Sequence, residues 1–128
     1  MRLLLDTHAL IWWLAGDEKL GRHAREAMSD EANPIFVSAA SAMEVATKFR
    51  IGKLPDAALL AQGFEVIIAS QGFTELGISV RHARLAGEMG IDHKDPFDRL
   101  LIAQALSEDL VLVSNETRFD DFAVKRVW

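Results

Sequence analysis

The sequence predicts an α/β fold with a mostly parallel central sheet of four to five strands, and three observations support this class. Short runs at residues 3–5, 35–37 and 110–113 are apolar without alternation, which is typical of strands buried on both faces. Segments with the helical spacing of apolar residues separate these runs along the whole chain. The chain has 128 residues, half of them apolar. This length suits one domain, residues 1–128, that buries roughly two-thirds of its unfolded surface.

Composition narrows the classes of function. The chain has no cysteine, which excludes disulfides and thiolate metal sites and fits a cytoplasmic protein. The apolar runs fall short of the ~20 residues of a membrane span, and the first residues lack the basic region and cleavage site of a signal peptide, so we expect no membrane association. The net charge of −5 argues against a general polyanion-binding surface. A bound cation and a local basic rim would still allow a nucleic-acid enzyme.

The elements of the first half can be justified in order. Residues 7–14 are apolar almost all round and predict a buried or interface-facing helix. Residues 20–29 segregate apolar from charged side chains and predict a surface helix. Gly52 is expected to cap the end of the following helix in a left-handed conformation. We expect strands at residues 3–5 and 35–37 and helices at residues 7–14, 20–29 and 41–51.

The second half continues the alternation. Pro55 is expected to start one long helix, and Ser79 to cap another. Asp95 followed by Pro96 is a typical helix start, with the acid as the cap and proline at the first helical position. We expect helices at residues 55–70, 80–89 and 96–108 and a short helix at residues 115–122. Strands are expected at residues 74–78 and 110–114, and an edge strand at residues 124–128.

Four acids are candidates for one edge of this predicted sheet: Asp6, Glu44, Asp98 and Glu116. Asp98 is the exception in the argument, because its helix leads into a strand and its position depends on how the preceding loop returns. Strand C-termini and the N-termini of the helices that leave them share one side of a parallel sheet, where open α/β folds place their ligands. Each acid taken alone also has a structural explanation. Asp6 can cap a helix, Ser41-x-x-Glu44 has the spacing of a capping box, and Asp98 lies in a first helical turn, where the helix dipole favours an acid.

The four acids together point to a cation. Two carboxylates ~4 Å apart repel by about 4 kcal/mol at an effective dielectric near 20, whereas an acid near a helix N-terminus gains only about 0.3–1 kcal/mol. A fold that gathers such acids must bind a cation or protonate one of them. Without cysteine, oxygen ligands favour Mg²⁺ or Mn²⁺. Such a site can activate water and neutralise charge on a phosphodiester, which is hydrolytic phosphate chemistry.

These motifs resemble the PIN-domain ribonucleases, in particular the VapC-type toxins of bacterial toxin–antitoxin pairs. The resemblance covers the whole chain. It is carried by Asp6 after the first strand, by Ser41-x-x-Glu44 in a helix ending in Gly52-Lys53-Leu54, and most specifically by residues 93–105, HKDPFDRLLIAQA. The resemblance implies a three-layer α/β/α sandwich and an acidic pocket that binds Mg²⁺ or Mn²⁺. It also implies endonucleolytic cleavage of RNA by a metal-activated water.

Carried over residue by residue, the resemblance makes Asp6, Glu44 and Asp98 the metal ligands and places Ser114 near the metal. The fourth family acid is usually Asp, three residues before an aromatic, but here it is Glu116, one methylene longer. Asp95 is interpreted mainly as a helix cap. The family also implies a cognate antitoxin, whose C-terminal segment covers the apolar helices and directs a basic residue to the acids, and a homodimer.

Basic and aromatic residues leave further alternatives open. Lys48 or Arg99 could touch the RNA backbone, although a salt bridge to a neighbouring acid is the simpler interpretation. Trp12 and Trp13 are adjacent on one helix and must point in different directions, so at least one is expected in the core. The candidate basic rim, each member of which can also be an ordinary surface charge, comprises Arg2, Lys48, Arg50, Lys53, Lys94 and Arg99.

Three rival interpretations remain. In an aspartyl-phosphate phosphatase Asp6 would be the nucleophile, but that chemistry commonly needs an acid two residues later, where this chain has His8. His8 and His93 lie near acids, but no segment has the spacing of a zinc site. The third alternative is a PIN-like scaffold that has lost cleavage and acts by binding protein or RNA.

Overall fold

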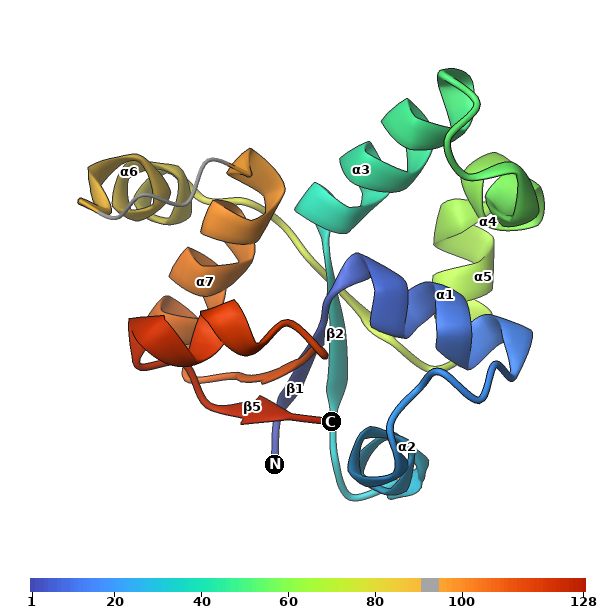
Figure 1. Ribbon diagram of the computed structural model, residues 1–128, viewed down its shortest axis with the longest axis horizontal. Helices are drawn as coiled ribbons and strands as arrows, with labels where there is room; N and C mark the ends of the chain where they lie inside the picture. Colours follow the sequence, from blue (N-terminus) through green and yellow to red (C-terminus); the bar gives the residue numbers. More distant parts are fainter. Residues whose placement is uncertain (91–94) are drawn as a thin grey trace.

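The computed structural model describes residues 1–90 and 95–128, and its strands form one parallel sheet in the order β3-β2-β1-β4-β5 (Figure 1). His93, part of the motif noted above, lies outside the described residues. The predicted α/β class and parallel sheet are confirmed. The strands are Leu3–Leu5 (β1), Ile35–Ser38 (β2), Thr74–Leu76 (β3), Val111–Val113 (β4) and Arg126–Val127 (β5).

The first strand is the centre of the sheet, with β2 and β3 on one side and β4 and β5 on the other. Leu3 lies opposite Ile35 of β2 and opposite Val111 of β4. The ladder extends one residue beyond the strand, where the Asp6 N–H donates to the Val113 carbonyl at 3.1 Å. Asp6 is therefore held by the sheet backbone at its carboxyl edge.

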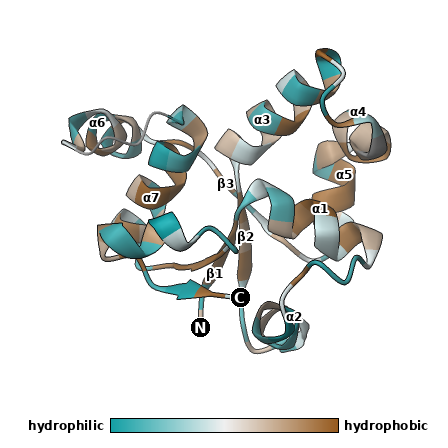
Figure 2. Ribbon diagram, in the orientation of Figure 1, coloured by the Kyte–Doolittle hydropathy of each residue, from teal (hydrophilic) through white to brown (hydrophobic). Residues whose placement is uncertain are grey.

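The side chains of β1 point alternately to the two faces of the sheet, and each face carries its own layer of the core. Leu3 and Leu5 pack on one face and Leu4 packs on the other, and all three are fully buried. The face with Leu3 is covered by α1, α2, α4 and α5, and the face with Leu4 by α7 and the 3₁₀ helix η2, so the molecule has three layers (Figure 1). Figure 2 shows apolar residues along the central strands.

The helices follow the predicted order with one difference. Residues 55–70 were expected to form one helix, but the structure divides them into η1, α4 and α5. Gly63, which has φ −136° and ψ 37°, separates α4 from α5, because glycine has a low helix propensity and tolerates this conformation. The bounds are Thr7–Ala15 (α1), Arg22–Ser29 (α2), Ala39–Arg50 (α3), Pro55–Ala57 (η1), Ala58–Gln62 (α4), Phe64–Ser70 (α5), Val80–Glu88 (α6), Pro96–Glu108 (α7) and Thr117–Phe122 (η2).

The tryptophans of α1 diverge as predicted. The Trp12 ring meets the ring of Trp128 edge-on at 5.7 Å, whereas Trp13 lies 6.5 Å from Phe73 and donates its indole N–H to Gln71 at 3.0 Å. Trp128 also lies against Gly21, where an added Cβ would come within 2.6 Å of it. The last residue of the chain is thus packed between α1 and the start of α2.

None of the helices in residues 1–90 and 95–128 is both long and apolar enough to cross a membrane.

Candidate active site

The candidate site lies at the carboxyl edge of the sheet, where three polar residues directly follow central strands. Asp6 follows β1, Ser38 ends β2 and Ser114 follows β4; all three are buried. Asp6 and Ser38 are also the caps of α1 and α3. The sheet topology alone therefore brings polar groups from three strands together at this edge.

Asp6 is a buried carboxyl with specific partners. Its side chain is 6 % exposed and accepts a hydrogen bond from the Ala9 N–H at 2.8 Å, so it caps α1, while the Ser114 hydroxyl donates to it. Burial, with a smaller contribution from the nearby charge of Asp98, nevertheless raises the pKa of Asp6 to about 6, against the lowering effects of the hydrogen bonds and of His8. Asp6 and Asp98 are thus two of the predicted acids that the structure brings together.

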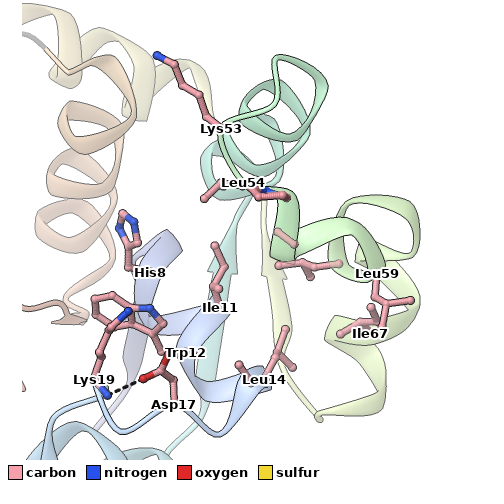
Figure 3. A pocket seen from close by; sticks show the side chains of 14 residues that line it. His8, Ile11, Trp12, Leu14, Asp17, Lys19, Lys53, Leu54, Leu59 and Ile67 are labelled. Carbon is pink, nitrogen blue, oxygen red and sulfur yellow. Dashed lines mark hydrogen bonds between the residues drawn. The ribbon is translucent and has the colours of Figure 1, made fainter.

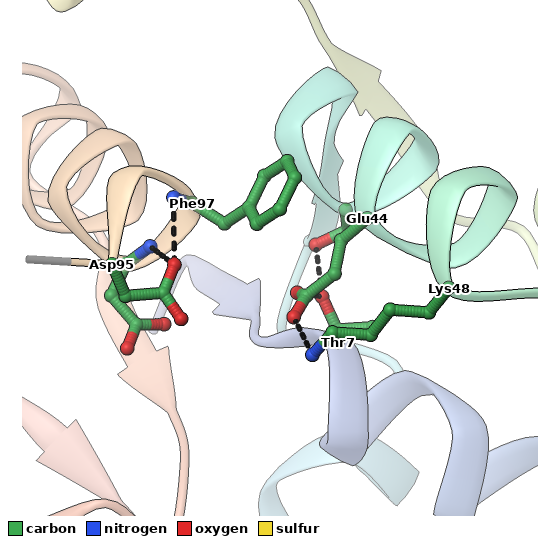
Figure 4. Close-up of polar contacts among 7 residues, drawn as sticks. Thr7, Glu44, Lys48, Asp95 and Phe97 are labelled. Carbon is green, nitrogen blue, oxygen red and sulfur yellow. Dashed lines mark hydrogen bonds and ion pairs between the residues drawn. The ribbon is translucent and has the colours of Figure 1, made fainter. Parts of the chain in front are cut away.

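Asp98 reaches this edge because α7 runs back across the sheet before entering β4. The predicted helix cap is confirmed: the Asp95 carboxylate accepts from the N–H groups of Phe97 at 2.9 Å and Asp98 at 3.3 Å. With Asp95 as the cap, Asp98 lies in the first turn of α7 without serving as the cap. The Phe97 side chain extends from α7 toward α3 (Figure 4).

Glu44 does not form the capping box that was its alternative structural explanation. The cap of α3 is Ser38, whose hydroxyl accepts from the Ala40 N–H, so Ser41 and Glu44 lie within the helix. Strand β2 passes directly into α3, and the helix therefore begins earlier than expected. Glu44 turns its carboxylate toward α1 instead of toward its own helix terminus (Figure 4).

Both oxygens of the Glu44 carboxylate are engaged. The Thr7 hydroxyl donates to Oε1 and also lies 3.2 Å from the Ser41 Oγ. The Lys48 ammonium contacts Oε2 at 2.6 Å. Glu44 is only 6 % exposed, so its carboxylate stands in a largely desolvated position. Because Thr7 is the residue next to Asp6, the contact also places Glu44 beside the Asp6 segment of the chain.

Glu116 lies farther out than the other three acids. Its side chain is 48 % exposed and is 3.5 Å from Arg118, while its backbone N–H donates to the Ser114 hydroxyl at 3.0 Å. The structure thus places Glu116 at the solvent-facing rim of the site, next to the residue that supports Asp6.

Sequence reasoning missed Thr7 as a site residue and left Arg99 open. The only sequence signal for Thr7 was its position directly after Asp6, at the junction of strand and helix. Arg99 donates to the carbonyl oxygens of Ala86 at 2.9 Å and Met89 at 2.6 Å. These contacts tie the end of α6 to α7, a favourable place for a cation.

The residues fit a hard divalent cation by their chemistry, although the site is not closed. Among residues 1–90 and 95–128, no group of three or more acidic, histidine or cysteine side chains is arranged to hold a metal ion. Mg²⁺, however, commonly takes one or two carboxylates and completes its shell with water and substrate phosphate oxygens. Asp6 and Asp98 supply two carboxyl groups. Burial raises the pKa of Asp6 by penalising the charged form, and Asp98 is near enough for its charge to raise that pKa further. A cation at this position would stabilise the charged form.

Comparison with known proteins yields similar structures. A chain of the VapBC2 complex of Rickettsia felis bound to a promoter DNA fragment shares 15 % identity at a TM-score of 0.72, covering 99 % of this chain and 98 % of that one. A chain of DNA-bound VapBC from Salmonella typhimurium shares 20 % identity at a TM-score of 0.68, and the match covers 99 % of this chain and 97 % of that one. A chain of a toxin–antitoxin complex from Klebsiella pneumoniae shares 24 % identity at a TM-score of 0.67, and the match covers 98 % of this chain and 96 % of that one.

These similarities confirm the predicted PIN-like sandwich as a fold. Among curated proteins, no sequence matches the chain. The family comparison is more direct: the PIN domain model matches residues 3–125, nearly the whole chain, including every acid discussed above. The chain belongs to the PIN domain family.

Proposed function

We propose that this protein is a metal-dependent endoribonuclease that hydrolyses RNA phosphodiester bonds and acts as the toxin of a toxin–antitoxin pair. The observation that carries the proposal is the buried Asp6 carboxyl, which has the charge of Asp98 beside it at the carboxyl edge of the sheet. Membership of the PIN domain family supports nuclease chemistry. The fold shared with chains of VapBC complexes supports the toxin assignment.

In this proposal Asp6, Glu44 and Asp98 are the catalytic metal ligands, and Glu116 contributes from the rim, directly or through water. When bound, Mg²⁺ or Mn²⁺ supplies an activated water and neutralises charge on the phosphate. The protein residues hold this arrangement. The Ser114 hydroxyl and the Ala9 N–H orient Asp6, and the Thr7 hydroxyl orients Glu44. The burial of Asp6 and Glu44 excludes water and strengthens every charge interaction at the site.

The proposed antitoxin partner has a candidate docking surface next to the acids. A pocket of about 570 Å³ lies between α1 and the segment formed by η1, α4 and α5 (Figure 3). Its lining is largely apolar and also includes the cations Lys19 and Lys53, the acid Asp17, and His8. Because the cations outnumber the acid, an amphipathic segment with apolar and acidic side chains would match this surface. His8 lies two residues after Asp6 in the sequence, so a segment bound in the pocket would lie near the Asp6 end of α1.

The alternative function is a PIN-like scaffold that binds protein or RNA without cleavage. Two observations favour it: both oxygens of the Glu44 carboxylate already have protein partners, and Glu116 is half exposed and paired with Arg118. Under either function, a homodimer and a cytoplasmic location stay predictions of the family resemblance and the composition.

Cleavage of RNA by the purified protein tests the proposal. We expect cleavage with Mn²⁺, none with EDTA, and a loss of at least about a hundredfold in Asp98→Asn, because a transition-state charge contact is removed. The matched control is Asp121→Asn, which makes the same chemical change at an exposed position of η2 and should keep wild-type activity. Equal activity of Asp98→Asn and wild type would contradict the proposal and point to a contaminating nuclease.

A further inference from the structure

Lys48 occupies a position that a metal ion at the acids would also require. Its ammonium lies 2.6 Å from Oε2 of Glu44, while the other oxygen of that carboxylate is held by Thr7 (Figure 4). The two residues are four positions apart on α3, the spacing at which Glu and Lys side chains meet on one helix face. Glu44 therefore already has a bound cation, provided by its own helix.

This ion pair differs from an ordinary surface pair in the burial of its acid. The Glu44 side chain is 8 % exposed and the Lys48 side chain 33 % exposed. A buried carboxylate without a partner is costly, so the ammonium compensates Glu44 as long as no other cation is present. Lys48 itself is on a flexible stem and is partly in solvent, so it can leave the carboxylate at little cost when a stronger competitor arrives.

We propose that Lys48 is the resident counter-cation of the site and competes with the divalent metal for Glu44. The inference rests on the metal site of the proposed function and adds a role for a residue outside the ligand set. Binding of the metal displaces the ammonium from Oε2, and Thr7 keeps the carboxylate in place during the exchange. Lys48 thereby weakens metal binding and sets the concentration at which the site fills. It is a positioning residue, because it acts through Glu44.

Mn²⁺ binding to the whole protein tests this directly, with free Mn²⁺ measured by electron paramagnetic resonance. We expect Lys48→Met to bind Mn²⁺ about tenfold more tightly than wild type, which corresponds to removing a competitor worth about 1.4 kcal/mol. The control is Arg50→Met, which removes the same charge from an exposed residue two positions farther along α3. This control should change the affinity by less than about twofold, because exposed charges are strongly screened.

A thermal melt separates competition from a purely structural role. Without metal, Lys48→Met should unfold at a lower temperature than wild type, because Glu44 loses its counter-ion. Saturating Mn²⁺ should raise its Tm by more than it raises the Tm of wild type, since a tighter ligand stabilises the folded state further. A structural ion pair alone would lower the Tm by the same amount with and without Mn²⁺, and that result would overturn the proposal.

The variants also distinguish failure of this inference from failure of the proposed function. If wild type binds Mn²⁺ and Asp98→Asn does not, but Lys48→Met binds no more tightly than wild type, the metal site stands and the role of Lys48 is refuted. If wild type shows no binding, Lys48→Met decides: binding that appears only in this variant supports the competition. Absence of binding in all three proteins refutes both.

Discussion

At the scale of single residues, Asp6 is a buried carboxyl whose charge the surrounding fold compensates only in part. Ser114 and the Ala9 N–H favour the charged form, but burial and Asp98 oppose it, and the pKa of Asp6 rises from 3.8 to about 6. Between these two values the folded protein binds a proton more tightly than the unfolded chain. The resulting stability is therefore fully present below the unfolded pKa and is lost as the pH rises through about 6.

This linkage predicts the behaviour of Asp6→Asn in the absence of metal. The variant cannot titrate and keeps a side chain that caps helices well. Above the pKa of Asp6 it should be more stable than wild type by up to about 3 kcal/mol, and the difference should shrink toward about pH 4. Urea unfolding at several pH values measures this difference. Asp121→Asn, an exposed control on η2, should follow the wild-type pH profile; a pH-independent difference for Asp6→Asn would contradict the account.

Thr7 is the residue that links the Asp6 segment to Glu44, and its hydroxyl can be removed almost without a change of shape. We expect Thr7→Val to lower the free energy of unfolding by about 1–3 kcal/mol, because the buried Glu44 carboxylate loses a donor. Thr7→Ser keeps the hydroxyl and is the control, with a smaller loss. Urea unfolding compares the two, and a valine variant as stable as the serine variant would show that the hydroxyl contributes little.

The position of Asp6 could be predicted from the sequence pattern, whereas the position of Asp98 and the environment of Glu44 could not. Strand–helix alternation places the residue after β1 at the carboxyl edge of a parallel sheet, but α7 leads into β4, so alternation leaves open where its first turn lies; only the family resemblance predicted that Asp98 joins Asp6. The Ser41-x-x-Glu44 spacing, by contrast, fits a capping box as well as two residues inside a helix. Only the structure shows that Ser38 is the cap. The contact between Thr7 and Glu44 joins residues 37 positions apart and has no local sequence signal.

At the scale of elements, most bounds could be predicted because caps and apolar periodicity agree. The exception is the segment from η1 to α5, where apolar residues continue through Gly63 but the helix does not. Periodicity reports which residues face the core, and it does not register a change in the direction of the backbone. The Ser79 cap, by contrast, was predicted correctly. The structure adds His82, which accepts from the Ser79 N–H and completes a capping box at the start of α6.

The junction of α1, α2 and the last residue gives a prediction about packing. A Cβ at Gly21 would meet the backbone and ring of Trp128 at 2.6 Å. Gly21→Ala should therefore lower the free energy of unfolding by about 1–3 kcal/mol through overpacking. Gly87→Ala is the control. Nothing lies within 4 Å of its added Cβ, and because Gly87 is in α6 this alanine should be neutral or stabilising by about 0.5–1 kcal/mol.

Thermal or urea unfolding of the two alanine variants decides the packing prediction. A second change, Trp128→Leu, should reduce the loss caused by Gly21→Ala, because residues in contact are not additive in their effects. Equal stability of Gly21→Ala and wild type would mean that the chain end moves away freely and contributes little to holding α1 against α2.

At the scale of the whole molecule, the order of strands explains why the site forms at one place. Strand β1 is central, with β2 on one side and β4 on the other, so the residues that follow all three strands are neighbours. The apolar pocket of α1 includes His8, two residues after Asp6, which is why our proposal assigns catalysis and antitoxin binding to the two ends of the same segment. Sequence patterns predicted the parallel sheet, and the family resemblance predicted the three layers, but the side-chain pairing at the edge depends on contacts between distant elements.

The chemistry of the RNA ends tests the central claim most directly, namely that the acidic edge of the sheet activates water for hydrolysis. RNA cut in the presence of Mn²⁺ should carry no 2′,3′-cyclic phosphate, because water and not the neighbouring 2′-hydroxyl attacks the phosphorus. Asp98→Asn should not yield these hydrolytic products. Cyclic phosphate ends, or identical products from Asp98→Asn and wild type, would contradict this account of the site.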